Sequence, residues 1–149
     1  MRPLILTYGM GIGPEISLHS LQELAGSVGP VILAGRRTSL EAALAGIELC
    51  GPQASLTQIR YFDDDTEPAE VAAIRWAAME CASDRAAAMV TGPINKAQLI
   101  AQGFQFRGHT DFLSALFSTP VVMGFVGGKF RVALVTAHIP LMQVASQLS

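Results

Sequence analysis

PLILTYGMGIGPEISLHSLQELAGSVGPVILAGR, residues 3–36, decides the fold class of this chain. Two apolar runs of strand length, 3–9 and 30–36, flank a segment in which Pro14 suits an early helix position and Gly26 suits a stop. We expect one apolar face on this helix, formed by Ile16, Leu21, Leu24 and Ala25. A strand, a helix and a second strand in this order predict a βαβ unit with parallel strands.

The same alternation of strands and helices continues to the end of the chain. Further strands are expected at 56–62, 86–93, 121–127 and 130–136. Further helices are expected at 38–45, 68–84, 94–103, 110–117 and 140–149. Thr38 is predicted to cap the first of these helices, and Thr110 or Asp111 the fourth. The alternation predicts an α/β fold with helices on both faces of a mostly parallel sheet.

Three of these expected strands have particular positions in the predicted sheet. The run AAAMVTGP at 86–93 indicates a buried, central strand. The runs at 121–127 and 130–136 are joined through Gly127 and Gly128, a short glycine connection that predicts an antiparallel hairpin. We therefore expect the sheet to become mixed at this point.

Composition restricts the class of protein and its location. The chain has 149 residues, of which 50% are hydrophobic and 15% charged, with a net charge of -2, so a single core is expected and a nucleic-acid partner is not. No apolar run approaches the roughly 18 residues of a membrane span, and no secretory signal is recognised, so we expect a cytoplasmic protein. Cys50 and Cys81 show no metal-binding spacing and are predicted to be buried free thiols.

Two glycine-containing stretches follow expected strands. GMGIGPE at 9–15 precedes a helix, where backbone N–H groups favour anions, but its spacing is not GxGxxG and Glu15 would repel a phosphate, so a tight turn is favoured. VTGPINK at 90–96 lies at the carboxyl end of its strand, where ligands of open α/β sheets bind. Lys96 is read as an exposed lysine on the first turn of a helix, with a phosphate or carboxylate ligand as the alternative.

Two further stretches contain histidines able to take part in chemistry. GHTDF at 108–112 supplies an imidazole, a hydroxyl and a carboxylate, and helix capping would account for the last two but not for His109. TAHIP at 136–140 places His138 after an apolar strand, where a neutral imidazole can bind a divalent metal. For both histidines the alternative to a functional role is an ordinary hydrogen-bonded side chain. His19 is read as a surface residue, and DDDTEP at 63–68 as a solvated turn.

Four of these motifs in one order, GIGPEI, VTGPINK, GHTDF and VALVTAHIPL, resemble the N-terminal half of the 4-hydroxythreonine-4-phosphate dehydrogenase family of pyridoxal phosphate biosynthesis. The resemblance implies the α/β/α fold of isocitrate and isopropylmalate dehydrogenases, with a mostly parallel, partly mixed sheet. Over residues 1–149 it implies a single α/β region, without the family's C-terminal half.

The resemblance also implies a chemistry and a set of site residues. Members oxidise a small phosphorylated hydroxy amino acid with NAD or NADP and a divalent metal such as zinc, magnesium or cobalt, and the product loses carbon dioxide. By resemblance, His109 and Thr110 contact substrate and His138 is one metal ligand. A homodimer is implied, without a nucleic-acid or membrane partner. No role follows for Lys96 or Asp111.

The sequence departs from the family pattern in two places, which leaves alternatives open. TYGMGIGPE lacks the carboxylate that the family carries before GIGPE, and family members are about twice as long, so only part of the site is expected here. The alternatives are a non-catalytic remnant or ligand-binding module of the same fold, and a related dehydrogenase acting on threonate phosphate. A missing half would leave an unpaired strand and an incomplete helix layer with exposed apolar surface, which predicts self-association or poor solubility.

Overall fold

The computed structural model describes residues 1–63, 66–106 and 108–148. The chain divides into two compact units, unit 1 at Met1–Gln105 and unit 2 at Phe106–Ser149. The single α/β region expected over residues 1–149 stays a prediction, because compactness alone does not establish independent folding.

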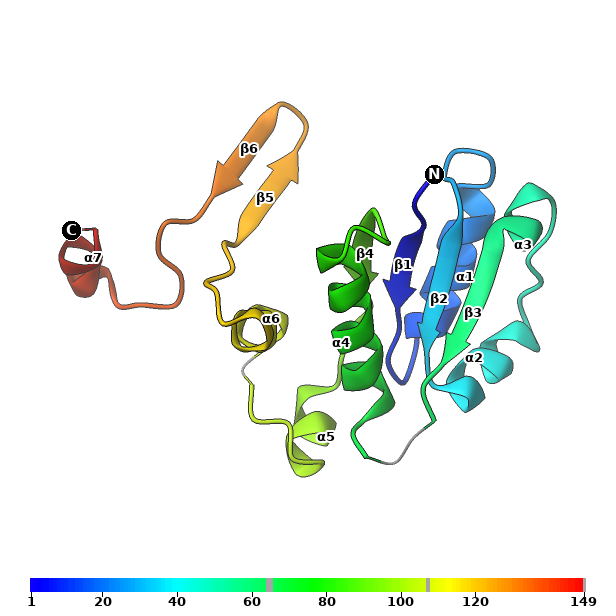
Figure 1. Cartoon of the computed structure of the whole chain (residues 1–149), viewed down its shortest axis with the longest axis horizontal. Coiled ribbons are helices and arrows are strands. Elements are labelled where there is room, and N and C mark those ends of the chain that lie inside the picture. Colours follow the sequence, from blue (N-terminus) through cyan, green and yellow to red (C-terminus); the bar gives the residue numbers. More distant parts are fainter. Residues whose placement is uncertain (64–65, 107, 149) are drawn as a thin grey trace. The chain divides into compact units, whose positions relative to one another are not determined.

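Unit 1 is built on a four-stranded parallel sheet (Figure 1). Its strands are β1 (Leu4–Thr7), β2 (Val31–Gly35), β3 (Thr57–Tyr61) and β4 (Ala88–Thr91), in the order β3-β2-β1-β4. β1 lies between β2 and β4 in the sheet, so that Leu4 is paired with both Val31 and Ala88. The βαβ unit and the parallel sheet expected from the sequence are confirmed.

The two faces of this sheet are covered by different helices. On one face, α1 (Gly13–Glu23) and α2 (Arg37–Leu44) contribute Leu18 and Leu40 to a core that includes Leu33 of β2. On the other face, α4 (Ala69–Ala82) places Ala73 and Ala77 among Ile5, Ala34 and their neighbours. Side chains alternate across a strand, so each strand supplies both cores. Two shorter helices complete unit 1, α3 (Pro52–Leu56) and α5 (Lys96–Ala101).

The buried face of α1 differs from the predicted one. Leu21 is buried as expected, but Ile16, Leu24 and Ala25 are exposed. The face that packs on the sheet is formed by Gly13, Pro14, Ser17, Leu18 and Leu21. Ser17 can occupy this face because its hydroxyl donates a hydrogen bond to the Gly13 carbonyl oxygen at 2.9 Å. The prediction assigned only apolar residues to the buried face, so it did not include Ser17 and chose the wrong face of α1.

β4 was predicted to be a buried central strand and is instead an edge strand. Among the described residues it pairs only with β1, and Val90 is 51% exposed. Its apolar composition therefore identified a strand but not the position of that strand in the sheet.

Unit 2 contains α6 (His109–Phe117), β5 (Gly124–Gly127), β6 (Phe130–Ala133) and α7 (Leu141–Gln147). The predicted antiparallel hairpin is confirmed, with a turn at Gly128 and Lys129 and a φ of 55° at Gly128. It forms a two-stranded sheet of its own, so the main sheet does not become mixed within the part of the chain that is described. The predicted caps on α6 are wrong, because Gly108 is the N-cap and no side chain caps this helix.

The cysteines are free but not buried. Cys50 is exposed and Cys81 is half-buried, which corrects their predicted burial. Partial burial raises the pKa of the Cys81 thiol. Within the described residues, no helix is long and apolar enough to cross a membrane.

Candidate functional site at the carboxyl edge of the sheet

In unit 1 the helical connections lie on opposite faces of the sheet on the two sides of one point in the strand order. The connection from β1 to β2 runs through α1 on one face, whereas the connection from β3 to β4 runs through α4 on the other. The loops that follow β1 and β4 therefore lie at a topological switch point. Ligands of open α/β sheets bind outside the carboxyl ends of the strands at such a point.

Glycines allow the two loops to approach each other closely. The Gly92 N–H donates to the Thr7 carbonyl oxygen at 2.7 Å, and a Cβ on Gly92 would lie 3.0 Å from that oxygen. A Cβ on Gly9 would lie 3.0 Å from both the Pro93 carbonyl oxygen and Cγ of Glu70. Both glycine motifs therefore serve close packing of backbone, and the tight turn favoured for 9–15 agrees with a φ of 82° at Gly11.

A pocket lies at this switch point, lined by Met10, Glu70, Asn95, Gln98, Leu99 and Gln102. Glu70 comes from the first turn of α4 and is only 6% exposed. Asn95 ends the loop after β4 and caps α5, because its Oδ1 accepts a hydrogen bond from the Gln98 N–H at 3.1 Å. Lys96 is exposed at the first position of α5, as its sequence context indicated. The lining mixes polar and apolar side chains and carries one carboxylate and no basic group.

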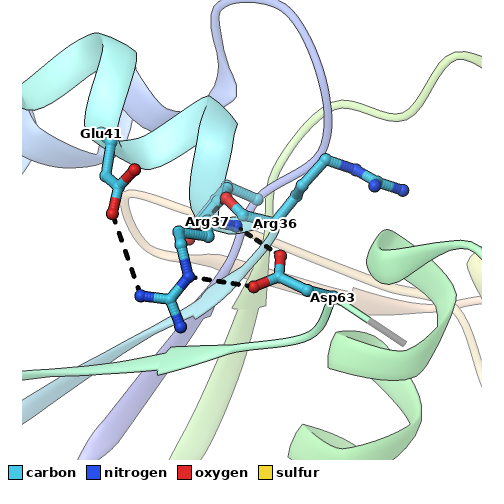
Figure 2. Close-up of polar contacts among 5 residues, drawn as sticks. Arg36, Arg37, Glu41 and Asp63 are labelled. Atoms are coloured by element: carbon cyan, nitrogen blue, oxygen red, sulfur yellow. Dashed lines mark hydrogen bonds and ion pairs between the residues drawn. The ribbon is translucent and has the colours of Figure 1, made fainter. Parts of the chain in front are cut away.

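A second group of polar contacts fixes the loops after β2 and β3 (Figure 2). Asp63 accepts hydrogen bonds from the Arg37 backbone N–H at 3.0 Å and from Arg37 Nε at 3.2 Å. The Arg37 guanidinium also lies 4.0 Å from the centre of the Tyr61 ring. Arg36 is the N-cap residue and its side chain makes no cap. The predicted Thr38 cap is therefore wrong, since a carboxylate from a distant loop performs that role.

Asp63 also changes the interpretation of the acidic turn at 63–68. Its carboxylate is a structural contact at the start of α2 and not merely a solvated charge. Residues 64–65 of the same turn lie outside the described residues.

The residues predicted to bind substrate and metal all lie in unit 2. His109 is the first residue of α6 and half-buried, with a buried Nε2 atom, and Thr110 is half-buried beside it. Asp111 is exposed in the same first turn. His138 is exposed in the connection between β6 and α7, five residues beyond the end of its strand.

His138 has an unusual backbone conformation for a residue with a side chain. Its φ is 60°, in the left-handed region that costs an L-residue about 1–2 kcal/mol. His138 is not part of a metal-binding cluster, because the described residues contain no group of three or more His, Cys, Asp or Glu side chains able to hold a metal ion. The residues present therefore do not make a divalent metal site by themselves.

Sequence reasoning missed Glu70 and Asn95, although one of them had a detectable signal. Asn95 and Gln98 have the spacing of a helix N-cap and its N3 position, a pattern that marks helix starts. Glu70 resembles any acidic residue in the first turn of a helix. Only the position of α4 beside the β1 and β4 loops gives it a buried environment.

The fold of unit 1 is a doubly wound α/β architecture with a pocket at its switch point. Residues 20–149 match the family described as pyridoxal phosphate biosynthetic protein PdxA. The chain belongs to this family.

Curated relatives have the same name in several bacteria. The chain is 32% identical to 4-hydroxythreonine-4-phosphate dehydrogenase of Xanthomonas axonopodis pv. citri, over 93% of this chain and 49% of the relative. It is also 32% identical to the enzyme of Chromobacterium violaceum, over 93% of this chain and 48% of the relative. The chain spans about half the length of the curated relatives it matches.

Solved structures agree with the observed fold. A 4-hydroxythreonine-4-phosphate dehydrogenase from Klebsiella pneumoniae aligns with a TM-score of 0.76 and 27% identity, covering 98% of this chain and 54% of that one. The enzyme from Burkholderia phymatum aligns with a TM-score of 0.77 at 24% identity, covering 96% and 52%, which supports the fold alone. The expected family and its mostly parallel α/β architecture are confirmed.

Proposed function

We propose that this chain supplies one half of a dehydrogenase site for 4-hydroxythreonine 4-phosphate in pyridoxal phosphate biosynthesis. The observation that carries the proposal is the family match over residues 20–149, which includes both histidine motifs in their expected order. The relatives are named dehydrogenases, which supports a nicotinamide cofactor, NAD or NADP. Because those relatives are about twice as long, the proposal concerns a partial site.

The substrate contacts are assigned to His109 and Thr110. Both are half-buried in the first turn of α6, where an imidazole and a hydroxyl can each exchange hydrogen bonds with a polar substrate. The start of the helix also has a dipole that favours an anionic substrate. A phosphorylated hydroxy amino acid has the hydroxyl, carboxylate and phosphate groups that such a position can bind.

His138 is assigned as one ligand of a divalent metal such as zinc, magnesium or cobalt. When bound, such a metal would lower the pKa of a substrate hydroxyl and stabilise charge on a neighbouring oxygen. His138 is exposed, so its imidazole is accessible to a metal shared with groups outside this chain. A homodimer in the cytoplasm, as expected for the family, would provide a second copy of the same ligand only.

A non-catalytic remnant that binds ligand without turnover is the second candidate. The observation that favours it is the absence of a metal-binding group among the described residues. A related dehydrogenase acting on threonate phosphate would use the same two histidines and differ only in substrate.

The experiment measures NADH or NADPH formation and ligand binding on the purified chain. The chain is mixed with metal, either dinucleotide and 4-hydroxythreonine 4-phosphate, and in a parallel reaction with threonate phosphate. His138→Ala should weaken zinc binding, measured by calorimetry, by about tenfold or more. His109→Ala should weaken substrate binding and leave zinc binding unchanged.

His19→Ala is the matched control, because His19 is exposed in the middle of α1 and far along the chain from both motifs. Ligand binding without turnover would support the remnant. Equal ligand affinities for all three histidine variants and the unmodified chain would contradict the assignment of His109 and His138.

A further inference from the structure

Glu70 lines the pocket at the switch point, and its carboxylate has no partner among the described residues. Glu70 is 6% exposed, and no described residue donates a hydrogen bond to its carboxylate or forms an ion pair with it. Its carboxylate therefore faces the pocket and is available to a ligand that enters it.

The other side chains around the pocket supply oxygen atoms and no positive charge. Asn95, Gln98 and Gln102 each contribute a carboxamide, and Met10 and Leu99 complete the lining. Asn95 Oδ1 already accepts one hydrogen bond from Gln98, and a carbonyl oxygen has a second lone pair available. A carboxylate together with carboxamide oxygens suits a hard cation or an ammonium group.

The size of the pocket limits what can occupy it. Its cavity volume is about 10 Å³, close to the roughly 10–15 Å³ that one water molecule requires. A phosphate, a ribose or a nicotinamide ring is much larger than this space. A single carboxylate also provides too little charge for tight binding of a divalent ion, since affinity for such ions rises with the number of charged ligands.

We propose that this pocket binds a water-sized monovalent cation, either potassium or ammonium or the terminal ammonium group of a small molecule. Glu70 provides the charge, and the carboxamides of Asn95, Gln98 and Gln102 provide further oxygens. The bound cation would link α4 to the loops after β1 and β4 and so hold the switch point together. The proposal uses residues of unit 1 alone and does not depend on the dehydrogenase assignment.

The test follows the thermal unfolding of the full chain by circular dichroism at constant ionic strength. Tetramethylammonium chloride, whose cation is too large for the pocket, is replaced stepwise by potassium, ammonium, sodium or methylammonium chloride. Potassium or ammonium at 100 mM should raise the Tm by about 3–5 °C, as expected for a dissociation constant near 10 mM, and the rise should saturate. A rise with methylammonium as well would identify an ammonium group of a larger molecule as the natural occupant.

The variants separate this site from general effects of salt. Glu70→Gln keeps the shape of the side chain and should remove the cation-dependent rise in Tm. Glu15→Gln should retain it, because Glu15 is an exposed carboxylate in the first turn of α1 and does not line the pocket. Gln98→Ala, at an exposed position of α5, should weaken the response and serves if Glu70→Gln does not fold.

Two results would overturn the proposal. One is an equal Tm of the unmodified chain in all five salts, which would indicate that only water occupies the pocket. The other is a cation response that Glu70→Gln and Gln98→Ala both retain in full.

Discussion

Unit 1 and unit 2 contain similar kinds of residues but use their apolar side chains differently. In unit 1 the apolar residues of β1 and β2 are enclosed between helices on two faces, with Ile5, Val31 and Leu33 completely buried. In unit 2 the hairpin is exposed along both strands, and Phe112 is the only described residue that is buried. An isolated two-stranded hairpin is marginally stable in water. Apolar strands therefore form a buried core only where helices cover the faces of their sheet.

The largest expected difference between the units is in hydrogen exchange. Amides of β1 and β2 should open only with global unfolding, whereas those of α7, which has no buried residue, should exchange almost freely. We expect protection factors that differ by about 10³ or more, which corresponds to about 4 kcal/mol. Mass spectrometry of peptic peptides measures this difference. Equal protection of both units would show that unit 2 has a stabilising partner in solution.

Truncation of side chains should show the same contrast in stability. Leu33→Ala removes a completely buried side chain of β2 and should lower the free energy of unfolding by about 2–5 kcal/mol. Phe125→Ala, at a position that is 58% exposed in β5, should change it by less than about 0.5 kcal/mol. Urea unfolding followed by circular dichroism provides both values. A large loss for Phe125→Ala would place this ring in an interface.

The exposed apolar surface of the hairpin should cause self-association. Phe125 and Phe130 are 58% and 78% exposed and lie on the same face of the hairpin, and exposed apolar surfaces of this kind mark interaction sites or aggregation. Replacing both by lysine should weaken association by about tenfold or more, or about 1.4 kcal/mol, in sedimentation at several concentrations. Glu23→Lys, at an exposed position of α1, is the control for added positive charge. An unchanged association constant would locate the contact elsewhere.

Replacing Asp63 should show how much the stability of unit 1 depends on contacts between loops that are distant in the sequence. Asp63→Ala removes the acceptor of the Arg37 N–H and Nε bonds and should cost about 1 kcal/mol of stability. Thr38→Ala is the matched control, because Thr38 is the residue that the sequence favoured as the cap. If Thr38→Ala were the more damaging change in urea unfolding, the cap assigned to Asp63 would be wrong.

Gln53 in unit 1 has a buried side-chain amide that lacks hydrogen bonds among the described residues. It is completely buried in α3, and within the described residues neither Nε2 nor Oε1 of its side chain has a hydrogen-bond partner. An unsatisfied buried amide costs about 1–3 kcal/mol, so Gln53→Met, which preserves the length of the side chain, should raise stability by about 1 kcal/mol. Destabilisation would indicate that a buried water satisfies the amide. Gln58→Met, on an exposed position of β3, is the control.

Part of the site could be predicted from the sequence and part could not. The glycine motifs after β1 and β4 marked the loops that meet at the switch point, because the rule for open α/β sheets depends on strand ends alone. Glu70 carried no such signal, since its burial depends on α4 crossing to the second face. For the histidines, the family resemblance implied roles for His109 and His138, which stay predictions, and the structure adds their positions in the first turn of α6 and in an exposed connection.

The sequence by itself determined most of the elements: a βαβ start, the helices that follow except α3, the parallel character of the sheet and the hairpin, because these depend on local periodicity and turn residues. The tertiary structure decided the order β3-β2-β1-β4, the edge position of β4, the buried face of α1, the capping of α2 by Asp63 and the burial of Glu70. These features depend on which segments meet across long separations in the chain. Local patterns contain no information about that choice, which is made by the burial of whole faces at once.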